Sequence, residues 1–203
     1  MKKINIIKNI IIFIVVFCGL CYSLESILDN NLYRTLIRLS VIPIIFLPKI
    51  VKKIFKLNIS EVSEMIYIIF IFVAHFLGSI VNLYNKIYWY YNFIHFLSGF
   101  VISFFALELL IRLKKYDLKK IFFNAIFIIG ISCIIASFWE YFEFISDNIF
   151  GKDAQNVLTT GVADTMMDMI LATLGNLLFI LIYIFEEFNN KKLIVKNFIK
   201  QVL

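Results

Sequence analysis

Long apolar segments recur along this chain, and they constrain its fold more than any other feature. Each is close to the roughly 20 residues that a helix needs to cross a bilayer. Of the 203 residues, 62% are hydrophobic and 17% are charged, which leaves too little polar surface for a soluble domain of this size. The six segments run over Ile6–Ser23, Leu36–Val51, Met65–Tyr84, Tyr88–Leu113, Ile121–Ile145 and Val162–Phe185. We therefore predict an all-α polytopic membrane helix bundle of about six transmembrane helices.

The second segment, Leu36–Val51, differs from the others. It carries Arg38 and both prolines, Pro43 and Pro48. A proline removes a backbone donor and kinks a helix, which a membrane protein tolerates where neighbours satisfy the freed carbonyls. The segment therefore either spans the bilayer as a kinked helix or lies in the interface.

Basic residues predict the orientation of the bundle. If the N-terminus is cytoplasmic, most of the 20 Lys and Arg residues flank cytoplasmic ends of spans. The exceptions are Arg34, Arg38, Lys86 and Lys152. We predict that both termini are cytoplasmic and that the protein is a multi-pass component of a bacterial cytoplasmic membrane. The net charge of +6 follows from these flanks. It therefore indicates contact with anionic lipid rather than with nucleic acid.

No polar segment is long enough for a separate soluble domain, so we predict one integral membrane domain over residues 1–203, with a core at 63–185. The tail, 186–203, places Lys192, Lys196 and Lys200 at four-residue spacing opposite apolar residues. This pattern suits either an amphipathic helix on the anionic leaflet or a solvated basic end.

Polar side chains inside the predicted spans gather at one depth, near the outer ends. Such residues are costly in a bilayer and mark functional sites. Helical spacing puts those of each span on a single face. They are His95 in the fourth span, Glu140, Glu143 and Asp147 in the fifth, Asp164 and Asp168 in the sixth, and Gln155 in the loop between.

Several carboxylates at close range require protons, a basic partner or a cation. A histidine with acidic residues suits a divalent metal, so the predicted ligands are His95, Glu140, Glu143 and Asp168. These four residues and Asp164 form the predicted catalytic set, in which a carboxylate outside the metal shell serves as general base. A network of carboxylates and imidazole that shares protons explains the same residues equally well.

A second group of residues is predicted to bind substrate. Asp147 and Gln155 lie close to the acidic stripes in sequence, and Arg34 and Arg38 are outward residues at helical i, i+4 spacing. The two arginines suit an anionic head group or counter-charge for the acids. Elsewhere, His75 is expected to form a hydrogen bond with a neighbouring residue. The small residues Ser98, Gly99, Ala172 and Gly175 are expected to permit close helix packing.

The motifs that carry these residues resemble the YjdF-like bacterial inner membrane proteins, a family of uncharacterised function. The resemblance covers about 66–184, and its motifs are Asn92–Gly99, Trp139–Phe144 and Gly161–Asp168 with Gly175-Asn176. A remoter similarity is to the VanZ-like proteins, which have an acidic residue four positions before the histidine. This chain has Tyr91 there, which removes one potential carboxylate.

Three functions fit these observations. The leading hypothesis is a site that binds or modifies a lipid-linked or envelope head group at the outer leaflet, with a divalent metal as a possible cofactor. The alternatives are a transporter coupled to protons or cations and a non-catalytic envelope protein. The sequence leaves open whether the protein is an enzyme, and the lipid bilayer is its expected partner.

Overall fold

Helices form all the regular secondary structure in the part of the chain described by this computed structural model, residues 2–203, with side chains from Ile4 onward. Five helical segments are long and apolar enough to cross a bilayer. They run over Ile4–Leu28, Glu61–Ile80, Tyr90–Arg112, Ile121–Phe150 and Ala163–Phe188. The prediction of an all-α membrane bundle is therefore confirmed.

The segment Leu36–Val51 does not form one continuous helix. It falls within α2 (Leu32–Ile45) and α3 (Leu47–Phe55), which meet at Phe46. Pro48 lies in the first turn of α3, where its missing N–H costs nothing, and this placement favours a new helix start over continuation of α2. Each helix alone is shorter than a bilayer-spanning helix. Six spans and cytoplasmic termini remain predictions.

The contacts divide the chain into two compact units, Met1–Tyr91 and Asn92–Leu203, which we call unit 1 and unit 2. Unit 1 contains α1 (Lys2–Leu28), α2, α3, α4 (Glu61–Ile71), the π-helical segment η1 (Phe72–Ile80) and α5 (Leu83–Lys86). Unit 2 contains most of α6 (Tyr90–Arg112) and all the helices that follow. This division does not test the predicted single domain over 1–203 with its core at 63–185, which stays a prediction.

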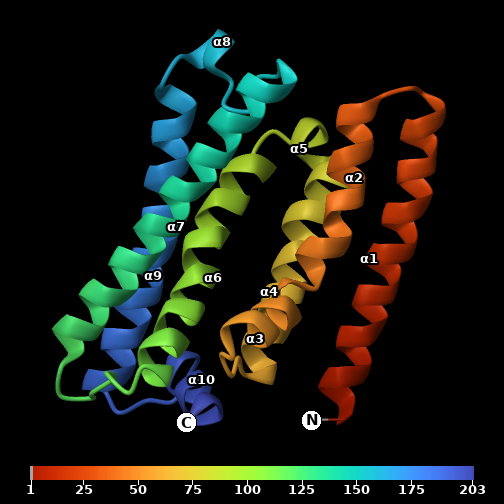
Figure 1. Cartoon of the computed structure of the whole chain (residues 1–203). Helices are drawn as coiled ribbons and strands as arrows, with labels where there is room; N and C mark the ends of the chain where they lie inside the picture. The colour runs from red at the N-terminus through yellow and green to blue at the C-terminus, as the bar shows by residue number, and fades with distance from the viewer. Residues whose placement is uncertain (1) are drawn as a thin grey trace. The chain divides into compact units, whose positions relative to one another are not determined.

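Apolar side chains from α1, α2, α4 and η1 form the core of unit 1. In this unit α1 and α2 are antiparallel neighbours, and α4 continues directly into η1 (Figure 1). The centre of the core consists of fully buried Val15, Val41, Ile45 and Ile68. Burying such side chains is the main stabilising contribution within the unit.

Polar contacts join the helices of unit 1 at two points. His75 Nε2 lies 3.1 Å from Ser40 Oγ and 3.2 Å from the Ile37 carbonyl oxygen, which confirms the hydrogen bond expected for this residue and shows that it joins η1 to α2. At another point, the carboxylate of Glu64 lies 3.1 Å from Lys8 Nζ and 3.4 Å from Lys52 Nζ. Glu64 therefore links three helices through ion pairs that are mostly removed from solvent.

Three long helices make up unit 2: α6, α7 (Ile121–Phe150) and α9 (Ala163–Phe188). Helices α6 and α9 run in the same direction, and α7 runs opposite to them (Figure 1). The short α8 (Val157–Thr160) follows α7 at one end of the unit. At the other end α10 (Val195–Val202) lies beside the end of α9 (Figure 1).

Backbone contact between α6 and α9 sets their register. A Cβ at Gly99 would overlap the Ala172 carbonyl, and a Cβ at Gly175 would overlap the Phe96 carbonyl, so only glycine fits at both positions. One turn further along, Asn176 Nδ2 donates to Ser103 Oγ at 2.8 Å. These contacts confirm the expected close packing at small residues.

The tail pattern is amphipathic, and its apolar face has a partner inside unit 2. Val195, Phe198 and Val202 are buried, and the Phe198 ring packs against Phe104 of α6 with 4.9 Å between ring centroids. The carboxylate of Glu186 accepts hydrogen bonds from the backbone N–H groups of residues 194–196 at 2.7, 3.0 and 2.7 Å. This carboxylate caps the start of α10 and fixes it to α9.

Candidate functional site

The register of α6 and α9 brings a histidine and an aspartate together. The Asn176–Ser103 pair has a sequence offset of 73. The same offset relates Ala172 to Gly99 and, one turn before, Asp168 to His95. His95 Nε2 lies 3.5 Å from Asp168 Oδ2, with 11% and 1% of the two side chains exposed. The glycine contact therefore places both groups inside the bundle.

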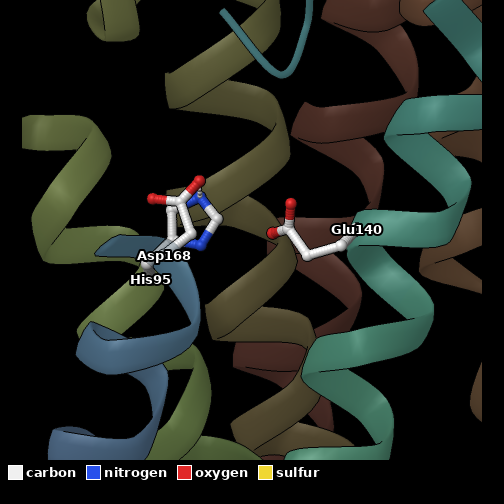
Figure 2. A group of neighbouring side chains, drawn as sticks. All are labelled: His95, Glu140 and Asp168. Carbon is white, nitrogen blue, oxygen red and sulfur yellow. Dashed lines mark ion pairs between the residues drawn. The ribbon is translucent and has the colours of Figure 1, made fainter. Parts of the chain in front are cut away.

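Helix α7 contributes the third group of the cluster. Glu140 is 5% exposed and points towards His95 and Asp168 (Figure 2). One ligand atom from each of the three residues can be chosen so that all lie within 4.8 Å of one another. Three helices thus converge on one point, where they bring together three of the four residues predicted to bind a metal; metal binding stays a prediction. We call His95, Glu140 and Asp168 the triad.

Glu143, the fourth predicted ligand, lies beside the triad. It is buried, and its Oε1 accepts a hydrogen bond from the indole Nε1 of Trp139 at 2.9 Å. Its Oε2 has no hydrogen-bond partner among the described residues. The charged groups that act on it are the carboxylates of Glu140, Asp168 and Asp164. A carboxylate oxygen in such surroundings requires a proton or a cation.

Asp147 and Gln155, predicted to bind substrate, meet in the loop that follows α7. Asp147 Oδ1 accepts from the Ala154 N–H at 2.7 Å, and Oδ2 accepts from the Gln155 N–H at 3.0 Å. This turn brings Gln155 Nε2 to 3.5 Å from Glu140 Oε2 and 3.3 Å from the Thr165 hydroxyl. Asp147 therefore shapes the loop, and Gln155 reaches the triad through Glu140.

Asp164 lies one turn before Asp168 on α9 and is half-buried. Its Oδ2 accepts a hydrogen bond from Asn156 Nδ2 at 2.9 Å. Asn156 has positive φ, which asparagine tolerates well, and so turns the chain into α8. Asp164 consequently connects the loop to α9 at the edge of the cluster.

Arg34 and Arg38 contact acidic residues of unit 1. The guanidinium of Arg38 lies 3.0 Å from Glu25 Oε2 and also donates to the Tyr22 carbonyl, so it helps to join α1 and α2. Arg34 lies 4.0 Å from Asp29 in an exposed pair. The role predicted for both arginines in binding substrate stays a prediction.

Two residues of the site had no role assigned from sequence. Trp139 orients Glu143 through a hydrogen bond, and the i, i+4 spacing of the two residues in the sequence is the feature that could have indicated this contact. Thr165 contacts Gln155, and it follows Asp164 directly. Hydroxyl and indole groups are common on membrane helices, so neither spacing alone distinguishes them from packing residues.

The donor set of the triad fits a divalent cation. An imidazole nitrogen with two carboxylate oxygens suits Zn²⁺, Mn²⁺ or a similar ion, with bonds of about 2.0–2.2 Å. Bonds of that length place neighbouring ligand atoms roughly 3–3.5 Å apart. The distance between His95 and Asp168 already meets this spacing, and Glu140 reaches it by moving about an ångström, which a rotamer adjustment supplies.

Comparison with known proteins places the chain in a family. A family model described as a predicted membrane protein, DUF2238, matches residues 8–187, which is most of the chain. An uncharacterised protein of Thermotoga maritima is 28% identical over 133 residues, covering 64% of this chain and 66% of that protein. The match therefore spans just under two thirds of this relative's length. No solved structure matches the chain.

Proposed function

We infer that this chain, which belongs to the DUF2238 family of predicted membrane proteins, binds a divalent cation with His95, Glu140 and Asp168. The site lies in the bacterial cytoplasmic membrane, near the outer leaflet, and acts on the polar head group of a lipid-linked substrate. The observation that carries this inference is the convergence of three ligand atoms from three helices within 4.8 Å.

Electrostatics support a cation at this point. The triad and Glu143 include three carboxylates inside segments that cross the membrane. Their mutual repulsion in a medium of low dielectric is large unless positive charge or protons compensate it. A divalent ion held by the triad would compensate two of these charges.

The residues around the triad have distinct chemical roles in this proposal. The cation, when bound, supplies Lewis acidity towards a phosphate or carbonyl oxygen of the head group. Glu143 is held through Oε1 by the Trp139 indole, so its Oε2 is available to accept a proton from an attacking hydroxyl or water. Gln155 donates to Glu140 and limits the rotation of that carboxylate. Glu143 is thus the proposed general base.

Packing beneath the triad supports a closed site over a carrier pathway. Between α6 and α9 the next layers are the Gly99–Ala172 backbone contact and then the bond between Ser103 and Asn176. The ring of Phe179 follows, 4.8 Å from that of Phe104. A transporter requires a polar route through these layers, and they are filled with protein atoms.

Metal content tests the proposal directly. We expect protein purified from cells supplied with Zn²⁺ and Mn²⁺ to retain one ion per chain through dialysis. The variants Glu140→Gln and Asp168→Asn preserve side-chain volume and remove a charged ligand, so both should lose the ion. Changing a residue that hydrogen-bonds a metal ligand usually weakens metal binding by about 10- to 100-fold, and the loss of a ligand itself should exceed this range.

The matched control is Glu108→Gln, which changes another buried carboxylate of α6 that pairs with Arg112 at 3.0 Å. This variant should keep its metal. Equal metal content in the wild type, Asp168→Asn and the control would show that any ion is bound elsewhere. Wild-type protein without metal would refute the proposal.

A further inference from the structure

A shallow hollow on the surface of unit 2 includes one residue of the triad, Glu140, in its lining. Its lining includes Glu140 of α7, Gln155 of the loop, and Thr165 and Met169 of α9. Glu140 therefore borders the hollow and also faces His95 and Asp168 inside the bundle. A ligand in the hollow would therefore meet the triad at Glu140, without passage through the end of the bundle.

A second hollow adjoins the first along α9. Met169 lines both, and the second continues over Ile170, Thr173 and Leu174. The hydroxyl of Thr173 donates to the Met169 carbonyl at 2.8 Å, so this part presents an apolar surface. From Thr165 to Leu174 the helix rises about 14 Å, which is close to half the thickness of the hydrocarbon core.

Lipid-facing side chains surround the polar part of the hollow. Tyr141 and Phe144, which line it, are 58% and 59% exposed, and Ile170 is 48% exposed. A large apolar surface on a helix that crosses the membrane faces hydrocarbon. The hollow therefore opens sideways into the bilayer, and its ligand enters as a membrane lipid.

The polar groups in the hollow indicate the chemistry of the head group. They are a carboxylate, an amide and a hydroxyl, from Glu140, Gln155 and Thr165, and the described lining includes no lysine or arginine. The hydroxyl of Ser137 donates to its own helix at the Cys133 carbonyl, 3.0 Å away. Because the lining side chains carry no positive charge of their own, they favour a neutral head group with several O–H donors and disfavour an anionic phosphate.

We propose that these two hollows form one lipid site, which binds a neutral glycosyl lipid. Sugar hydroxyls contact Glu140, Gln155 and Thr165, and an acyl chain lies along Met169 to Leu174. This lipid site would place a hydroxyl-bearing head group at the edge of the proposed metal site. Its role in a reaction therefore rests on the proposed function. Binding in the lipid site itself requires no metal.

The test uses full-length protein in phosphatidylcholine nanodiscs and two probes with the same photoreactive acyl chain. One probe is a glucosyl diacylglycerol and the other is phosphatidylcholine. After irradiation, mass spectrometry locates and counts the labelled residues. We expect the glucosyl probe to label 165–174 several-fold more than the phosphatidylcholine probe, because only its head group donates hydrogen bonds to the hollow.

A pair of variants separates the lipid site from general lipid contact. Met169→Trp fills the point that the two hollows share, and should reduce labelling by the glucosyl probe to the phosphatidylcholine level. Met167→Trp makes the same change at an exposed residue that lines neither hollow, and should leave the labelling unchanged. Equal labelling by the two probes, or no effect of Met169→Trp, would overturn the proposal.

Metal content of the same samples distinguishes the two proposals. Met169→Trp should keep its ion, and Asp168→Asn should lose its ion while selective labelling persists. Selective labelling in a wild-type protein that holds no metal would support the lipid site and refute the metal site. Metal binding without selective labelling would support the metal site and refute the lipid site.

Discussion

Replacing Gly99 by alanine should separate α6 from α9 and disturb the triad one turn away. The added methyl group would overlap the carbonyl of Ala172, which is backbone and cannot rotate aside. An ordinary C···O contact is about 3.3 Å, so relief of the overlap requires the helices to move apart by more than about an ångström. His95 and Asp168 would move with them.

The expected cost follows from this geometry. Overpacking a core site lowers the free energy of unfolding by about 1–3 kcal/mol. The added methyl group meets backbone atoms, which cannot move aside as a side chain can, so we expect about 3 kcal/mol here. The separation also strains the hydrogen bond between Ser103 and Asn176, which lies one turn further along the same contact. We therefore expect Gly99→Ala to lower both the free energy of unfolding and the affinity for metal.

Gly130 provides the matched control, because nothing lies within 4 Å of a Cβ built there. Gly130→Ala should be neutral or should stabilise α7 by up to about 1 kcal/mol, through helix propensity alone. Reversible unfolding of both variants by SDS in mixed micelles, followed by circular dichroism, measures the difference. If the two variants unfold within about 0.5 kcal/mol of each other, the close contact of α6 and α9 is wrong.

Three further predictions concern polar contacts away from the triad. Glu186→Ala removes the acceptor for three backbone donors and should cost about 3 kcal/mol or more, seen as faster proteolysis of α10; unchanged digestion would contradict the cap. Ser103→Ala leaves Asn176 Nδ2 without its buried acceptor and should lower the free energy of unfolding by about 1–3 kcal/mol, whereas no loss would argue against this bond. Glu64→Gln leaves Lys8 mostly buried beside a neutral group and should cost about 3–5 kcal/mol; a stability equal to that of the wild type would mean that Lys8 reaches water.

Local helix geometry explains how much of the candidate site could be predicted from sequence. The faces of Glu140 with Glu143, and of Asp164 with Asp168, follow from residue spacing alone. The register that places His95 beside Asp168 depends on two glycines in backbone contact. Sequence identifies such small residues as packing positions, but it does not give the partner that each one meets.

Other predictions depended on partners that spacing does not reveal. The tail pattern suited either an amphipathic helix on the anionic leaflet or a solvated basic end. In the structure the tail forms a helix whose apolar face packs against α6 and α9 within unit 2. Asp147 shares a helical stripe with Glu143, yet its carboxylate is bonded to the backbone of the following loop. Arg38 has an acidic neighbour on α1, Glu25, which lies just past the predicted segment Ile6–Ser23. In each case a tertiary contact decided the role.

The central claim is that His95, Glu140 and Asp168 together ligate one divalent ion. Pulsed electron paramagnetic resonance of protein loaded with Mn²⁺ tests it most directly, because a coordinated imidazole nitrogen modulates the electron spin echo. We expect nitrogen modulation from one histidine per ion, which disappears in His95→Gln and persists in His75→Gln. Modulation that is absent from the wild type, or that survives in His95→Gln, would contradict the claim.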